Sequence, residues 1–343
     1  MKKVRGLWNS ALAGLALSVL ACQAAPATAQ DTVPPVVPAG EAPAASSVVV
    51  GFQLMTTSTG TEVGIWYPSH GMAHEMPLGP YRQNVAPGGA IAGHGLPLVV
   101  ISHGNGGGFT SHVDTAEALA RAGFVVAALT HPGDNWKDQS KATDMAARPR
   151  SVQQVITYML EEWPGQGTLD PDKVGAFGFS SGGFTVLAAA GGKPDFQLMA
   201  PHCKAHPDFY DCKLIRANGM SSAPVWSVER DARIKALVVA APALGFTFAD
   251  QGLAQVTVPV QLWRADADEI LPAPDYADAV RATLPTVPEF HTVPDAGHFD
   301  FLAPCNGPIR IPAICTSASG FDRTAFHARF NAAVVAFFSQ TLG

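Results

Sequence analysis

The sequence is poor in basic residues. Its 343 residues include 22 Lys and Arg against 28 Asp and Glu, which gives a formal net charge of −6 at pH 7. Three of the basic residues fall within the first five positions, so the rest of the chain is still more acidic. A protein that binds nucleic acid needs the opposite sign of charge, because it must displace counterions from phosphates. The composition therefore excludes a nucleic-acid partner.

Cysteine is also scarce, with five residues in the whole chain. Four of them form two close pairs, Cys203 with Cys212 and Cys305 with Cys315. In an oxidising compartment this spacing favours two local disulfides. The alternative is a metal site, because His202 and His206 flank Cys203 and zinc ligands come in such clusters, although the spacing matches no standard zinc finger.

The apolar stretch near the N-terminus is too short for a membrane span. It runs from Leu7 to about Ala21, follows Lys2, Lys3 and Arg5, and precedes the small-x-small pattern at residues 27–29. This order predicts a secretory signal peptide over residues 1–29, and hence an exported protein, periplasmic or secreted. The alternative is a loose lipobox that ends at Cys22, where cleavage would leave a lipid anchor.

Residues 30–47 are rich in Ala, Pro and Val and carry almost no charge. Such a segment cannot bury enough apolar surface to fold alone, which is typical of a linker. Residues 48–343 contain no second linker and no internal repeat, so we expect them to form one domain.

Runs rich in Val and Ile alternate with helical patterns along this domain. The alternation predicts an α/β fold, in which crossover helices flank a mostly parallel sheet. The eight expected strands are Val48–Met55, Glu62–Tyr67, Leu96–Ser102, Gly123–Leu129, Lys173–Phe179, Ile234–Ala241, Val258–Trp263 and Glu289–Val293, of which the first two form an antiparallel hairpin. Helices are expected at Val113–Ala122, Pro149–Glu161, Ser181–Ala190, Ala273–Thr283 and Asp322–Phe338. This eight-stranded order is the layout of the α/β-hydrolase fold.

A long excursion, at about residues 193–230, interrupts this alternation. It has no clear periodicity and carries the first cysteine pair. Loops of this length in compact domains are usually functional or disordered, and a disulfide argues against disorder. We therefore expect a disulfide-bridged insertion in the position of a lid.

A G-x-S-x-G pattern is centred on Ser180, within Gly178-Phe179-Ser180-Ser181-Gly182-Gly183. It follows a strand-like run and precedes a helix-like run, which is the setting of a nucleophile elbow. The flanking glycines leave room for a tight turn, and the N-terminus of the following helix directs free N–H groups toward a developing oxyanion. Ser180 is therefore the predicted nucleophile.

A serine hydroxyl needs an adjacent base, and the base needs a carboxylate to orient it. His298 lies just past the last expected strand, after Gly297, and is the predicted base. Three carboxylates follow the preceding strand, namely Asp266, Asp268 and Glu269, and Asp268 is the predicted acid. The resulting order Ser…Asp…His is the one that α/β hydrolases use.

A glycine-rich loop, His103-Gly104-Asn105-Gly106-Gly107-Gly108, follows the third expected strand and is similar to the H-G-G-G motif of esterases. We assign the two oxyanion-hole donors to the backbone N–H groups of Asn105 and Ser181. A phosphate-binding loop is disfavoured, because neither G-K-[ST] nor a complete G-x-G-x-x-G with its partner acid is present.

These motifs together resemble exported bacterial hydrolases of the dienelactone-hydrolase-like group, which is related to the platelet-activating-factor acetylhydrolases. The resemblance covers nearly all of residues 48–343 and includes Val63–Pro68, Leu98–Gly104, Gly178–Gly183, Asp268–Pro272 and Ala296–Phe299. In that group the Asp of a D-x-x-V-P-like stretch is the triad acid, which supports Asp268 over Asp266. Authentic dienelactone hydrolases carry Cys at the nucleophile position, where this chain has Ser180.

The expected function is hydrolysis of a small or medium carboxylic ester through an acyl-enzyme, with no cofactor and no metal. The same triad would serve an amidase, a peptidase, a lactonase or an acetylhydrolase of the phospholipase A2 type. A non-catalytic binding protein on this fold would be expected to lack a triad member. The sequence sets no oligomeric state.

Overall fold

The structure, a computed structural model, describes residues 48–219 and 226–343. The predicted signal peptide at residues 1–29, the alternative lipid anchor at Cys22 and the predicted linker at residues 30–47 lie outside the described residues. Within the two described ranges, no helix combines the length and the apolarity that crossing a membrane requires.

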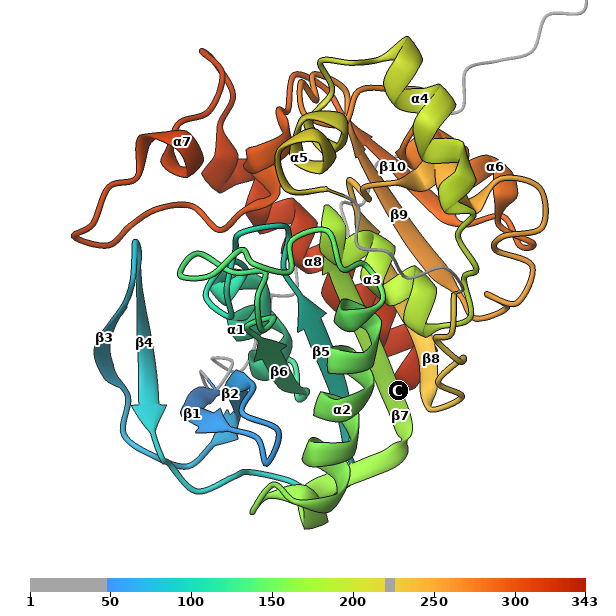
Figure 1. Ribbon diagram of the computed structural model, residues 1–343. Coiled ribbons are helices and arrows are strands. Elements are labelled where there is room, and N and C mark those ends of the chain that lie inside the picture. Colours follow the sequence, from blue (N-terminus) through green and yellow to red (C-terminus); the bar gives the residue numbers. More distant parts are fainter. Residues whose placement is uncertain (1–47, 220–225) are drawn as a thin grey trace, which may run out of the picture. The chain divides into compact units, whose positions relative to one another are not determined.

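In the described part of the chain, ten strands form one mixed sheet in the order β10-β9-β8-β7-β5-β6-β2-β1-β4-β3 (Figure 1). The six strands from β10 to β6 are parallel, whereas β2 pairs antiparallel with both β6 and β1. The central strands are apolar along their length and buried on both faces, as parallel strands covered by helices must be. The bounds are β1 Val49–Thr56, β2 Glu62–Ser69, β3 His74–Leu78, β4 Tyr81–Pro87, β5 Leu96–Ser102, β6 Val125–Leu129, β7 Leu169–Phe179, β8 Ile234–Ala240, β9 Val260–Ala265 and β10 Glu289–Val293.

The prediction of eight strands was wrong by one hairpin. A strand lies at each of the eight expected positions, and β3 and β4 form an additional antiparallel hairpin that extends the sheet beyond β1. The turn is Gly79-Pro80, with Gly79 at a φ of +64°. Strand β3 is largely exposed and contains Pro77, and β4 alternates buried with exposed positions, so neither strand has the continuous Val and Ile run that marked the other strands.

Helices cover both faces of the sheet (Figure 1). On one face, α2 and α3 share an apolar core with residues such as Ile156, Phe184 and Leu187. On the other face, α1 and α8 contribute residues such as Leu119 and Phe330 to a second core. The bounds are α1 Val113–Arg121, α2 Ala147–Glu161, α3 Ser181–Ala189, α4 Met199–Ala205, α5 Tyr210–Asn218, α6 Ala277–Thr283, α7 Pro312–Cys315 and α8 Arg323–Leu342.

The excursion between α3 and β8 contains the short helices α4 and α5, which lie beyond the carboxyl ends of the central strands (Figure 1). Neither helix was predicted, because neither carries a long apolar stripe. A disulfide between Cys203 and Cys212 joins them, with the two Cα atoms 5.3 Å apart. The second pair, Cys305 and Cys315, is also bonded, with a Cα separation of 5.5 Å. Both expected disulfides are thus present, and the Cys203 sulfur is not available as a metal ligand.

Candidate active site

Ser180 occupies the sharp turn between β7 and α3. Its backbone lies at φ 56° and ψ −121°, outside the regions that non-glycine residues ordinarily adopt. The turn requires glycine on both sides, because a Cβ at Gly178 would lie 2.1 Å from the Gly182 oxygen, and a Cβ at Gly182 would lie 1.9 Å from the Ser102 oxygen. The strained turn holds the Ser180 hydroxyl at the carboxyl edge of the sheet, as a nucleophile elbow does.

The structure brings Ser180, His298 and Asp268 together from three separate segments. His298 Nε2 lies 3.0 Å from Ser180 Oγ, and His298 Nδ1 lies 2.7 Å from Asp268 Oδ2. Asp268 follows β9 and His298 begins the 3-10 helix η4, His298–Phe301, after β10. Because these strands are parallel to β7, their carboxyl ends meet at the edge where the elbow lies. The imidazole also packs on the ring of Phe179, with centroids 4.8 Å apart.

The environment of Asp268 keeps its carboxylate ionised. Burial alone would raise its pKa, but the charge of His298 and the hydrogen bonds from His298, Leu271 and Ile270 outweigh burial, so the pKa is lowered. The backbone N–H groups of Leu271 and Ile270 donate to Oδ1 at 2.7 and 2.9 Å, which leaves Oδ2 for the imidazole. The two competing carboxylates, Asp266 and Glu269, are exposed, and Asp266 pairs instead with Arg264 at 2.8 Å.

The glycine-rich loop after β5 passes directly over the elbow. A Cβ at Gly104 would lie 3.1 Å from the Cβ of Ser180, so glycine permits the close approach. Among the described residues, the backbone N–H groups of Asn105 and Ser181 donate to no protein acceptor. Two backbone donors close to a reacting hydroxyl, with no protein acceptor of their own, are what an oxyanion hole requires.

A buried ion pair that the sequence analysis missed holds this loop in place. Arg148 of α2 pairs with Asp134, and each side chain is only 2% exposed. Asp134 Oδ1 accepts hydrogen bonds from the side-chain amide (Nδ2) of Asn105 at 2.6 Å and from the backbone N–H of Gly106 at 3.0 Å. The Arg148 guanidinium also donates to the His103 carbonyl and to Thr185 of α3. The pair therefore links the glycine-rich loop to the helix that follows Ser180.

Two buried histidines support the same loop. His103 Nε2 accepts from the His131 backbone N–H at 3.0 Å, so Nδ1 carries the proton and donates to the Gly104 carbonyl at 2.5 Å. Burial and then the charge of Arg148 lower the pKa of both His103 and His131 well below 6.5, so both rings stay neutral. His131 Nε2 in turn lies 2.8 Å from the Ser102 hydroxyl.

One largely apolar pocket lies at Ser180, and a second lies along the glycine-rich loop. The first, with an empty volume of about 870 Å³ that is partly open to solvent, is lined by Ser180 and by Met199, Leu214 and Ile215 of the insertion. The second, about 1480 Å³ and also partly open, lies along the glycine-rich loop and is lined by Phe299 and by Ile309 and Ile314 from the Cys305–Cys315 segment. Both disulfide-bridged segments thus form pocket walls.

Comparison with known proteins gives two matches. Residues 111–204 match the sequence model of the prolyl oligopeptidase family, a segment that contains Ser180 and ends before Asp268 and His298. A protein of Nocardia uniformis subsp. tsuyamanensis with the name "Putative esterase NocK" is 29% identical over 236 residues, which cover 62% of this chain and 67% of that protein.

Both matches, taken with the mostly parallel sheet and its flanking helices, support an α/β-hydrolase fold. They also support serine hydrolase activity, of the esterase or the peptidase kind.

Proposed function

We propose that this protein is an exported carboxylesterase in which Ser180 is the nucleophile, His298 the general base and Asp268 the orienting acid. The observation that carries the proposal is the unbroken hydrogen-bonded relay from Asp268 Oδ2 through His298 to Ser180 Oγ, at 2.7 and 3.0 Å. The relay lies beside the backbone N–H groups of Asn105 and Ser181, to which we assign the oxyanion hole.

In this mechanism Ser180 Oγ attacks the ester carbonyl carbon while its proton passes to His298 Nε2. The carbonyl oxygen becomes an oxyanion that accepts from the two backbone donors. Collapse of this intermediate breaks the bond to the alcohol, which leaves with the proton from His298. Water then attacks the acyl-enzyme with His298 again as base, and the carboxylic acid is released. Asp268 stays ionised and stabilises the imidazolium in both steps.

The pockets favour a neutral ester with apolar groups on both sides of the scissile bond. The walls of the first pocket are mainly aliphatic and aromatic, and its acidic residue, Asp211, accepts a hydrogen bond from the Tyr276 hydroxyl at 3.0 Å. The similarity to NocK favours an ester over an amide, and the sequence motifs resemble those of the dienelactone-hydrolase-like group. The two disulfides agree with an oxidising compartment, and therefore with export.

A peptidase is the second candidate, because residues 111–204 match the prolyl oligopeptidase family. The same triad cleaves amides, and the two activities differ in the leaving group that must be protonated. Paired substrates with one acyl group, a p-nitrophenyl ester and the corresponding p-nitroanilide, separate the candidates. We expect turnover of the ester alone; a higher kcat/KM for the anilide would assign a peptidase.

Removal of the Ser180 hydroxyl tests the nucleophile. Ser180→Ala should lower kcat for a short p-nitrophenyl ester by on the order of 10⁴-fold to 10⁶-fold, because the nucleophile and its base act as one unit. Ser181→Ala is the matched control: only the backbone N–H of Ser181 has an assigned role, so this variant should keep most of its activity. Wild-type rates in Ser180→Ala would remove the assignment.

A further inference from the structure

A second cluster of side chains, separate from the triad, lies where the insertion meets the segment before α6. His202 belongs to α4, His206 follows its last residue, and Asp275 lies two residues before α6. One ring nitrogen from each histidine and one carboxylate oxygen of Asp275 lie within 4.8 Å of one another. His206 Nε2 and Asp275 Oδ2 are 3.8 Å apart, too far for a hydrogen bond and close enough to share an ion.

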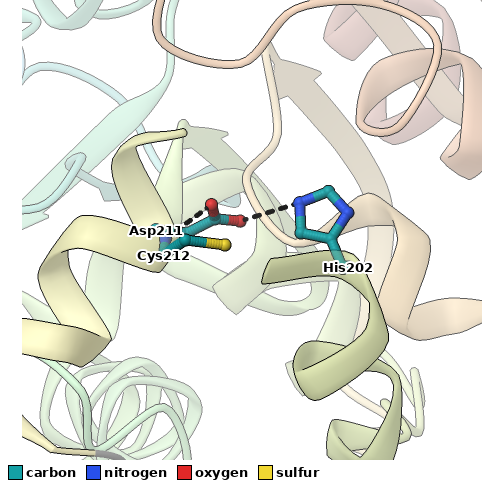
Figure 2. A group of neighbouring side chains, drawn as sticks. All are labelled: His202, Asp211 and Cys212. Carbon is teal, nitrogen blue, oxygen red and sulfur yellow. Dashed lines mark hydrogen bonds and ion pairs between the residues drawn. The ribbon is translucent and has the colours of Figure 1, made fainter. Parts of the chain in front are cut away.

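The Cys203–Cys212 disulfide brings a further carboxylate to this cluster. Cys203 directly follows His202, and Cys212 directly follows Asp211. The disulfide therefore places the His202 and Asp211 side chains against each other (Figure 2). Asp211 Oδ2 lies 3.8 Å from His202 Nε2 and accepts from the Tyr276 hydroxyl at 3.0 Å. The Cys212 sulfur in Figure 2 belongs to the disulfide and is not a ligand.

Aromatic side chains fix the orientation of both imidazoles. His202 stacks on Phe246 at a centroid distance of 3.7 Å, and His206 stacks on Phe209 at 4.5 Å. His202 Nε2 also lies 3.3 Å from the Tyr276 hydroxyl, within hydrogen-bond reach.

We propose that His202, His206 and Asp275 bind a divalent transition-metal ion, with zinc as the ion that the donor set fits best. Imidazole nitrogens favour zinc, copper or nickel, whereas calcium and magnesium require oxygen ligands throughout. Zinc bonds of about 2.0–2.1 Å need ligand atoms roughly 3.3 Å apart, so the cluster must contract slightly. His206 and Asp275, with side chains 38% and 28% exposed, have the freedom to do so.

The ion would fasten the insertion to the catalytic core. His202 and His206 lie next to the first disulfide, and Asp275 lies on the segment that begins at the triad acid, Asp268. Asp211 and Tyr276 would then surround the ligands, in the way that hydrogen-bonded partners orient metal-binding histidines. Because the cluster is distinct from the triad, this role is structural, and the ion would stabilise the folded state through its preferential binding.

The test is metal binding by the purified full chain, free of affinity tag and with its disulfides intact. Isothermal titration with zinc, the visible absorption of the cobalt(II) form and the unfolding temperature with and without zinc are measured for wild type, His206→Gln and Asp275→Asn. His291→Gln is the matched control, because His291 also pairs with a carboxylate, Glu289, at 2.7 Å, but belongs to no cluster with a second imidazole among the residues that the structure describes.

We expect one zinc per wild-type chain, a rise in unfolding temperature and a cobalt absorption band, none of which calcium or magnesium reproduces. His206→Gln and Asp275→Asn should each weaken zinc binding at least tenfold, whereas His291→Gln should bind as wild type does. The proposal is overturned if wild type binds no zinc, or if both ligand variants bind it as tightly as the control. Ester hydrolysis by apo His206→Gln should equal that of apo wild type, so the result is independent of the proposed function.

Discussion

The buried pair of Asp134 and Arg148 should support catalysis without contacting the substrate, and Asp134→Asn tests this. The substitution keeps the shape of the side chain and removes its charge. Asp134 now accepts from Arg148 through Oδ2, and from Asn105 and Gly106 through Oδ1. In either orientation of the new side-chain amide, its NH₂ group faces other hydrogen-bond donors: Arg148 in one orientation, and Asn105 with Gly106 in the other. Either the guanidinium or the oxyanion loop therefore loses its acceptor.

The size of the effect follows from burial and from the position of the loop. Breaking a buried ion pair by removing one partner costs about 3–5 kcal/mol, compared with about 5–15 kcal/mol for the free energy of unfolding of a typical domain. The variant should therefore fold with reduced stability. A displacement of about 1 Å costs on the order of 10²-fold in rate, and complete loss of one oxyanion donor costs about 10²–10³-fold. We expect kcat to fall about tenfold to hundredfold, with a smaller change in KM.

The assay combines steady-state hydrolysis of a p-nitrophenyl ester with urea unfolding monitored by fluorescence. Asp231→Asn is the matched control: Asp231 is 8% exposed and pairs with Arg233 at 2.6 Å, away from the oxyanion loop. This control should lose stability and keep its kcat. The reasoning is refuted if Asp134→Asn is folded and retains the wild-type kcat, or if both variants lose kcat to the same degree.

Three further substitutions test the orienting acid, the turn at Ser180 and a buried histidine. Asp268→Asn should lower kcat by about 10⁴-fold by leaving the imidazole without its orienting carboxylate, whereas Asp266→Asn, at an exposed position, should change it little; comparable losses in steady-state assays would reassign the acid. Gly182→Ala should abolish activity and reduce the yield of folded protein, because its Cβ would lie 1.9 Å from the Ser102 oxygen; a folded, active variant would contradict the geometry of the elbow. Burial lowers the pKa of His112 to about 3, so the folded state favours the neutral ring, and stability is lost as pH falls from about 6.5 toward 3. In urea unfolding series over this pH range, His112→Gln should reduce the slope of the unfolding free energy against pH by about 1.4 kcal/mol per pH unit. An unchanged slope would show that His112 does not cause this loss of stability.

A strand could be predicted from the sequence where its burial leaves a continuous apolar run in the strand itself. Strands such as Leu96–Ser102 and Ile234–Ala240 are covered on both faces, so their sequences are almost continuously apolar. The hairpin of β3 and β4 has no such run, since it lies at the sheet edge, where β3 is largely exposed and β4 alternates exposed with buried residues. Helices α4 and α5 depend on a disulfide and on aromatic contacts such as that of His202 with Phe246, which no periodicity in the sequence reveals.

The site, too, contains residues that local sequence patterns predict and residues that only the tertiary structure reveals. Ser180 lies in a pentapeptide that its turn geometry demands, and His298 and Asp268 follow strands whose ends meet that turn, so local patterns pointed to all three residues. Asp134 and Arg148 belong to no motif, and charged residues at such positions are ordinarily solvated. Their link to Asn105 exists only once α2 packs beside the oxyanion loop, so it depends on the tertiary structure.

Covalent labelling shows whether the Ser180 hydroxyl is the activated nucleophile. The protein is incubated with a fluorophosphonate, digested and analysed by tandem mass spectrometry, with Ser180→Ala treated in parallel. We expect one phosphonate adduct per chain, on Ser180, and no labelling of the variant. An unlabelled wild-type protein, or an adduct on another serine that persists in Ser180→Ala, would rule out Ser180 as the nucleophile.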